Sequence, residues 1–354
     1  MYIHALRIKE LLKSFGALLF MALVFLYPAV SAQAAKDGLN IFLYLLLPSL
    51  FPFAVISGYL SGRLHFPKIC GTGFVRLTGL SENCFTPFLL GMLSGFPVGA
   101  ILTANAVKSN SISTETAAHL LPFCSLPGPL FMIGVVGGGM LGSYKAGYLL
   151  YAVLLVSALL TALLFRRCAP FQSRSRKTAI SKIPLVHSIE KSVSALLTVG
   201  GFIMFFQVIC ELLRVTGVAD NLFFYPPLIY GFLEISSGLT RVALSDLSPL
   251  LKLSFVSGIC AFSGICVLLQ IAFAVRDTGI SLQKYFVYKC VTACIAFGLS
   301  YVVFRLYPLS VFSVNAAPDS FAFPIAFLIC AAALFFLSVL FLVLKRKVHT
   351  FDIR

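Results

Sequence analysis

The sequence predicts an all-α polytopic membrane protein with about eight transmembrane helices and two re-entrant hairpins arranged in inverted repeats. Hydrophobic residues make up 59% of the chain and charged residues only 11%, which leaves too little polar surface to cover a water-soluble core. The apolar runs are about 20 residues long, the length of a helix that crosses a bilayer. They also lack the alternation of polar and apolar residues that a membrane β-barrel requires.

The first apolar run extends from Ser14 to about Ala35 and follows a basic amino-terminal segment. It contains Ala32-Gln33-Ala34, a pattern found at signal-peptide cleavage sites, but the run is long and belongs to a membrane protein. We therefore expect a retained helix rather than a cleaved signal peptide. The other continuous apolar runs predict further spans at 39–60, 120–141, 145–165, 192–213, 250–275, 285–306 and 321–344.

Two further apolar stretches, Cys84–Lys108 and Asn221–Asp246, carry their glycine, proline and polar residues in the middle. Two half-helices joined by a turn at membrane depth suit this pattern better than one continuous helix. Each stretch is therefore expected to be re-entrant, leaving the membrane on the side where it entered.

The basic residues support this topology. Most of the 27 lysines and arginines fall on one side of the membrane when both hairpins are re-entrant and both termini are cytoplasmic. The order of span, hairpin, broken span and span then occurs twice, with opposite orientations. We expect an amino-terminal helix at 1–38, a first repeat at 39–165, a basic cytoplasmic linker at 166–191, a second repeat at 192–307, and a carboxy-terminal helix with a basic tail at 308–354.

The first hairpin contains the sequence Gly91-Met-Leu-Ser-Gly-Phe-Pro-Val-Gly99. Glycine and proline allow the backbone to reverse, and the exposed ends of half-helices present N–H groups to an anion. Close packing of helices through Gly95 and Gly99 is the alternative explanation. The solute-binding candidates from this stretch are Ser94, Gly95, Pro97, Gly99 and Asn105.

The next span contains Pro122, Pro127 and Pro129, which remove backbone donors at half depth. Freed carbonyl groups and a serine hydroxyl can bind solute or ion there, although a purely structural kink explains the prolines equally well. The candidates are Ser125, Pro127 and Gly128. The later GGGxxG pattern has no strand before it, so we assign it to helix packing rather than dinucleotide binding.

In the second hairpin, Glu234 and Arg241 are interpreted as the only acid and base well inside an apolar stretch. Charges at membrane depth are costly, so they are usually paired or face a polar cavity. Arg241 either recognises an anionic solute or forms an ion pair with Glu234. The candidates from the second half are Glu234, Ser236, Ser237, Gly238, Arg241 and, on the broken partner span, Ser263.

Other classes of function lack support in the sequence. There is no Ser-His-Asp arrangement, paired carboxylate or P-loop, so we expect no enzyme activity. The cysteines show no paired spacing and the histidines do not cluster, so we expect no metal and no cofactor. The net charge of +15 is explained by topology, so we expect no nucleic-acid partner.

The stretch from Gly91 to Leu141, particularly LSGFPVGA and LPGPLFMIGVVGGGMLG, resembles the YlbJ-type (SpoVV) sporulation integral membrane proteins. These belong to the nucleoside-recognition or gate-domain superfamily, which is related to concentrative nucleoside transporters. The resemblance covers most of Leu39–Leu344 and is weaker in the second repeat. It implies a multi-pass protein of the bacterial cell membrane, located during sporulation in the outer forespore membrane.

The resemblance also implies transport of dipicolinic acid, a small planar dicarboxylate, towards the forespore. An Asn-rich turn expected in gate domains is replaced here by Cys124-Ser125-Leu126, which weakens the case for a nucleoside as the solute. The alternatives are a nucleoside transporter and a non-transporting protein of spore-envelope assembly. The expected partners are the anionic solute and the bilayer, with a homo-oligomer or other sporulation membrane proteins left open.

Overall fold

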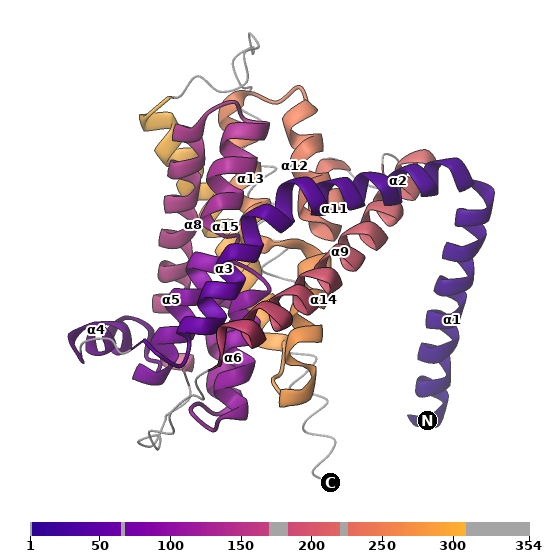
Figure 1. Ribbon diagram of the computed structural model, residues 1–354. Helices are drawn as coiled ribbons and strands as arrows, with labels where there is room; N and C mark the ends of the chain where they lie inside the picture. Colours follow the sequence, from indigo (N-terminus) through magenta and orange to yellow (C-terminus); the bar gives the residue numbers. More distant parts are fainter. Residues whose placement is uncertain (1, 65–67, 170–182, 220–225, 309–354) are drawn as a thin grey trace.

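The computed structural model describes residues 2–64, 68–169, 183–219 and 226–308. Every regular element in these ranges is a helix, and none is a strand. Figure 1 shows one body of helices packed side by side, from which α1 (Tyr2–Leu26) and α4 (Lys68–Thr78) project on opposite sides. The expected all-α class is therefore confirmed for the described part of the chain.

The amino-terminal segment breaks at Tyr27, not between Ala35 and Leu39 as predicted. α2 (Pro28–Asn40) begins with a proline, whose missing N–H and fixed φ suit the first position of a helix. The backbone then stays helical through η1 (Ile41–Leu46) into α3 (Leu47–Leu60). The predicted second span is thus the carboxy-terminal part of a longer helix.

The first predicted repeat contains two helix breaks at the expected glycine and proline residues. One break separates α5 (Phe85–Ser94) from α6 (Val98–Lys108), and the other separates α7 (Thr114–Cys124) from η3 (Phe131–Met140). The remaining elements of this repeat are η2 (Glu82–Cys84), α8 (Tyr144–Leu164) and, after it, η4 (Arg166–Cys168).

The second predicted repeat also contains two breaks, at Glu234 and Ser263. Its first helix, α9, begins at Leu185, so residues 185–191 are helical although the sequence assigned them to the linker. The elements are α9 (Leu185–Val215), α11 (Pro226–Leu233), α12 (Ile235–Leu244), α13 (Pro249–Phe262), α14 (Gly264–Val275), η5 (Arg276–Thr278) and α15 (Gln283–Leu306).

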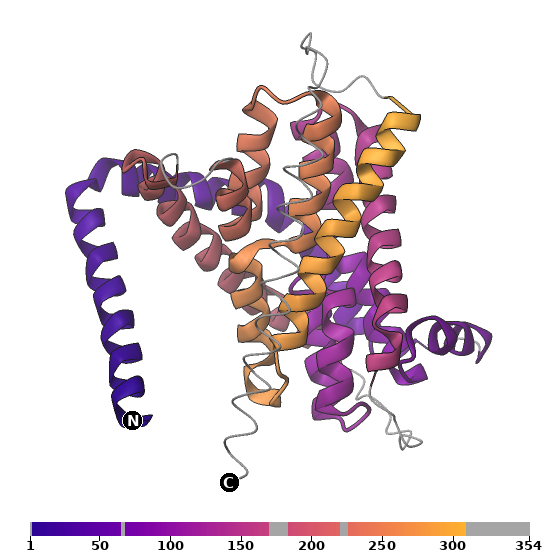
Figure 2. The same ribbon diagram turned by 180° about the vertical axis from the view of Figure 1, so that it is seen from behind.

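Two long helices connect the repeats. α15 packs against α7, α8 and α13, so the last helix of the second repeat touches the broken helices of both. α9 crosses the body obliquely and packs against α2, α3 and α14 (Figures 1 and 2). The broken helices therefore meet inside a shared apolar core, away from the projecting α1.

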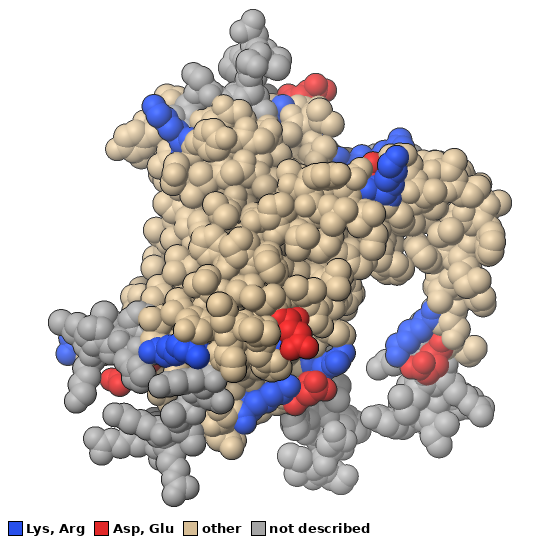
Figure 3. Space-filling model, viewed as in Figure 1, with Lys and Arg blue, Asp and Glu red and all other residues tan. Residues whose placement is uncertain are grey.

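Five helical stretches in the described ranges are long and apolar enough to cross a membrane: Pro28–Leu60, Tyr144–Leu164, Leu185–Val215, Pro249–Thr278 and Gln283–Leu306. Shorter apolar helices occupy Lys13–Leu26, Val98–Lys108 and Phe131–Met140. The span predicted at Phe321–Leu344 lies outside the described residues. Figure 3 shows the charged side chains towards the two ends of the body, with an uncharged band between them that suits lipid.

Candidate functional site

The turn between α5 and α6 lies directly on the break in the next helix. Gly95 has a φ of +77°, and a Cβ atom at this position would lie 2.6 Å from the backbone nitrogen of Gly128. The amide of Phe96 donates a hydrogen bond to the carbonyl of Leu126 over 3.1 Å. The structure thus brings together the turn at 94–97 and the break at 125–128, which the sequence singled out separately.

The backbones of α6 and of the end of α7 also touch, one turn further along α6. A Cβ atom on Gly99 would lie 1.8 Å from the carbonyl oxygen of Cys124, and one on Gly91 would lie 2.9 Å from the Cα of Gly99. Only glycine allows three chain segments to approach this closely. The carbonyl of Cys124 therefore lies beside the start of α6, where the sequence analysis expected free N–H groups for an anion.

Ser94 ends α5 and is 1% exposed. Its hydroxyl lies 2.5 Å from the hydroxyl of Ser57 on α3, and either oxygen can donate. The Ser94 hydroxyl also lies within 3.4 Å of the Phe53 carbonyl on the same helix. Both contacts link neutral groups, so the first turn is joined to α3 without any charge.

The second turn is built around Glu234, which is 1% exposed and caps the start of α12. Its carboxylate accepts hydrogen bonds from the amides of Ser236 and Ser237, at 3.0 and 2.7 Å. The side-chain amide of Gln207 on α9 donates to the same carboxylate over 3.1 Å. The Ser237 hydroxyl donates in turn to the Gln207 oxygen over 2.8 Å, which closes a buried network.

Glycines shape this second turn as they do the first. A Cβ atom on Gly238 would lie 2.2 Å from the Cα of Gly231, so α11 and α12 touch through their backbones. Gly264 has a φ of +78° and faces the carbonyl of Leu233 across the break between α13 and α14. Ser263 precedes it with a φ of 74°, and its hydroxyl donates to the carbonyl of Cys260.

The two halves place corresponding residues in corresponding positions. The sequence matches Gly91 with Gly231 and Gly128 with Gly264, and each pair lies where a helix turn touches a broken helix. In both halves, a polar side chain at the turn is joined to the long helix before it, through Ser57 in α3 and Gln207 in α9. The similarity between these glycine positions therefore extends to packing and hydrogen bonds.

Arg241 does not pair with Glu234, which corrects the ion-pair alternative. Its guanidinium donates to the carboxylate of Glu211 on α9 over 3.0 Å and lies 3.7 Å above the ring of Tyr230. Glu211 also accepts from Arg214. The Arg241 side chain is 23% exposed, so this ion pair lies at the edge of the body and not in its centre.

Lys289 on α15 is a charged residue in the core that the sequence analysis missed. It is 1% exposed, and its ammonium donates to the carbonyl of Ser125 over 3.0 Å, at the break after α7. The sequence placed it near the beginning of the span at 285–306, where lysine usually reaches the membrane surface. Tyr285 lies four residues earlier on the same helical face, and this pair of polar residues is the sequence pattern that could have indicated a buried polar site.

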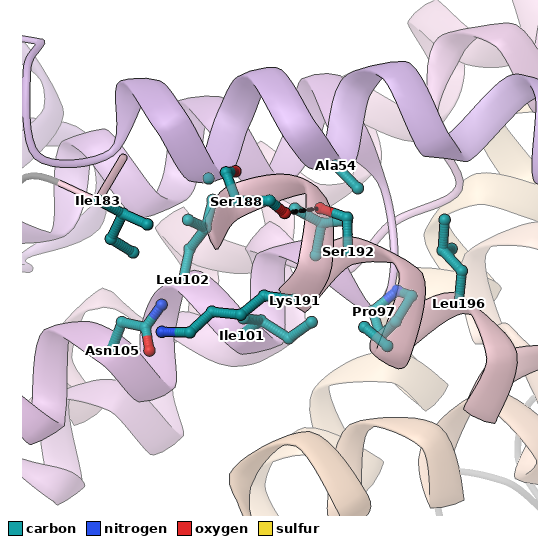
Figure 4. A pocket seen from close by; sticks show the side chains of 13 residues that line it. Ala54, Pro97, Ile101, Leu102, Asn105, Ile183, Ser188, Lys191, Ser192 and Leu196 are labelled. Atoms are coloured by element: carbon teal, nitrogen blue, oxygen red, sulfur yellow. Dashed lines mark hydrogen bonds between the residues drawn. The ribbon is translucent and has the colours of Figure 1, made fainter. Parts of the chain in front are cut away.

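Two of the predicted residues contribute to a separate pocket. Pro97 and Asn105 line a pocket between α3, α6 and α9, together with Ser188, Lys191 and Ser192. Figure 4 shows the Asn105 and Lys191 side chains pointing towards one another at one end, with the Ser192 hydroxyl bonded to the Ser188 carbonyl behind them. The pocket does not include Glu234, Arg241 or Ser263.

The described residues include no group of three histidine, cysteine, aspartate or glutamate side chains that could hold a metal ion. Most of the cysteines whose side chains the structure describes are buried, and they form no disulfide. The chemistry available at the two turns is therefore that of backbone amides and carbonyls, hydroxyl groups and the isolated charges of Glu234 and Lys289.

Long apolar helices, paired half-helices and polar groups buried at the turns define an integral membrane protein of the multi-pass helical class. The chain is 31% identical over 333 residues to the sporulation integral membrane protein YlbJ of Bacillus subtilis strain 168, and the match covers 79% of each sequence. The chain therefore belongs to the YlbJ family of sporulation integral membrane proteins. No family model and no solved structure matches it.

Proposed function

We propose that this protein is a membrane transporter for a small anionic solute, and that the solute is dipicolinic acid moved towards the forespore. The observation that carries the proposal is the meeting of two helix turns with two broken helices inside the apolar body. Broken backbone at membrane depth leaves polar groups without helical partners. Such breaks are tolerated where protein or a solute path satisfies those groups, as in transporters built from repeats.

The proposal includes the orientation of the chain. Both helix pairs, α5 with α6 and α11 with α12, re-enter on the side from which they came, and both termini are cytoplasmic. The short length of these helices supports this arrangement, because each has fewer residues than the roughly 20 needed to cross a bilayer. The outer forespore membrane is the proposed location, because the relative is a sporulation protein.

Labelling of cysteines tests the orientation. Cys168 is exposed at the start of the linker, so a membrane-impermeant maleimide should label it only after the cytoplasmic side is opened. A cysteine introduced at Thr350, in a Cys168→Ser background, should behave in the same way. Labelling of the two positions from opposite sides would contradict the inverted-repeat topology.

An uptake assay tests the function. Purified protein is placed in vesicles loaded with terbium, whose luminescence rises when dipicolinate enters and binds it. We expect uptake with the protein and none in empty vesicles. Uridine in excess should leave the rate unchanged, whereas a nucleoside transporter would be inhibited. Absence of both dipicolinate and uridine transport would favour the alternative, a protein of spore-envelope assembly.

Replacement of Arg241 by lysine tests whether this residue contacts the solute. Because the guanidinium already has Glu211 as its partner at a partly exposed edge, we expect uptake to change by no more than about fivefold, the value of an exposed ion pair. Arg214→Lys is the matched control, since Arg214 binds the same carboxylate. A much larger loss in Arg241→Lys alone would assign Arg241 to the solute site.

A further inference from the structure

The ammonium of Lys289 lies at the junction of the two repeats. It is carried by α15, which packs against α7 and α13, and it donates to the Ser125 carbonyl just after α7 ends. Cys124 and Cys260, near the ends of α7 and α13, are among the groups around it. Lys289 therefore lies between the two broken helices.

This charge has no acidic partner in the part of the chain that the structure describes. An ammonium has three N–H donors, and the Ser125 carbonyl accepts from one of them. The carboxy-terminal ends of α7 and α13 contribute partial negative charge, which offsets only part of the cost of burying a full charge. An isolated cation at this depth is therefore expensive to keep.

Tyr285 lies one helical turn before Lys289 on the same face of α15. Its ring centroid is 5.7 Å from the Lys289 nitrogen, and the residue is 2% exposed. Its hydroxyl has no hydrogen-bond partner among the described residues. A buried phenol normally finds a partner, so this hydroxyl and the remaining N–H groups of Lys289 are free to bind a ligand on the same face of α15.

We propose that Lys289 and Tyr285 form a binding site for one carboxylate of the transported solute. This inference rests on the proposed function and names the residues that recognise the anion. The ammonium supplies the charge and a charge-assisted hydrogen bond, and the phenol donates a second bond to the same carboxylate. The Ser125 carbonyl holds the ammonium at the break of α7, where the solute would meet it.

A purely structural role makes a different prediction. If Lys289 only neutralises the ends of α7 and α13, its replacement by methionine, which has similar length, should lower the thermal midpoint and leave uptake per folded protein unchanged. If it binds solute, the same variant should keep or raise the midpoint, because an isolated buried charge is removed. Uptake should then be lost.

The experiment compares Lys289→Met and Tyr285→Phe with Lys284→Met, which removes a partly exposed lysine from the same helix. Dipicolinate uptake should fall at least about tenfold in Lys289→Met, because it loses a hydrogen bond from a charged group. Tyr285→Phe should raise the KM about threefold to tenfold, and Lys284→Met should leave uptake unchanged. Dipicolinate should raise the thermal midpoint of the wild type but not of Lys289→Met.

The outcomes separate the two proposals. If Lys289→Met takes up dipicolinate at the wild-type rate, the carboxylate site is overturned and the transport function still stands. Thermal stabilisation by dipicolinate that requires Lys289, without uptake, supports the site and overturns transport. A wild type that neither takes up dipicolinate nor is stabilised by it overturns both. A neutral analogue, pyridine-2,6-dicarboxamide, should bind the wild type and Lys289→Met equally weakly.

Discussion

Replacing Gly99 by alanine should abolish transport and strongly destabilise the protein. The added Cβ atom would lie 1.8 Å from the Cys124 carbonyl oxygen, far inside van der Waals contact. The position of a Cβ atom is set by the backbone and its neighbour is a backbone oxygen, so α6 and the end of α7 must move apart, and we expect a loss of about 3 kcal/mol or more. The higher helix propensity of alanine, about 1 kcal/mol, does not offset this loss. The thermal midpoint in detergent and the uptake rate measure the two effects.

Gly298→Ala provides the matched control for this change. Gly298 lies within α15, and a Cβ atom there would meet nothing within 4 Å. The control should therefore be folded, active and no less stable than the wild type. Full activity in Gly99→Ala would show that the contact between α6 and α7 is not needed for transport.

Replacing Glu234 by alanine should cause the second large loss of stability. The change removes the cap of α12 and leaves the amides of Ser236 and Ser237 without their acceptor. It also leaves the Gln207 amide buried without this partner. A lost cap costs about 1 kcal/mol and a buried unsatisfied polar group about 1 to 3 kcal/mol, so we expect about 3 kcal/mol in total.

A double-mutant cycle measures the contact between Gln207 and Glu234 directly. Gln207→Leu and Glu234→Ala should together cost less than the sum of the separate losses, because each variant removes the same network. Glu190→Ala removes an exposed carboxylate from the same long helix, α9, and should cost little. Additive losses in the cycle would show that Gln207 and Glu234 do not interact in solution.

The sequence predicts helix breaks well because the cause of each break is local. Gly95 and Gly264 adopt a positive φ that most residues avoid, and Pro127 cannot donate to a helix. Ser94, Gly99 and Gly128 were selected for the same local reasons, and the structure brings them together. The membrane class also follows from composition, since apolar length is a property of the chain and not of its packing.

Long-range partners could not be predicted in the same way. Glu211, the partner of Arg241, lies in a different predicted span, so spacing along the chain favoured the wrong acid, Glu234. Lys289 lies one turn inside a predicted span, where a long side chain normally extends to the surface. Only the packing of α15 against α7 shows that it is buried. Glu211 and Arg241 meet because two helices of the second repeat lie side by side, whereas Lys289 is buried where a helix of the second repeat meets one of the first.

The hydrogen bonds that join the two turns to their long helices differ in kind, which predicts the order in which the turns separate from those helices. Moving α5 away from α3 separates the Ser94 hydroxyl from the Ser57 hydroxyl and from the Phe53 carbonyl, which are all neutral groups. Moving α12 away from α9 breaks the Gln207 contacts with Glu234 and Ser237, and one of these involves a buried carboxylate. A neutral hydrogen bond contributes about 1 kcal/mol and one to a charged group contributes more, so we expect the first turn to separate from its long helix at the lower cost. The first repeat is then the half expected to move first, with the second as its support.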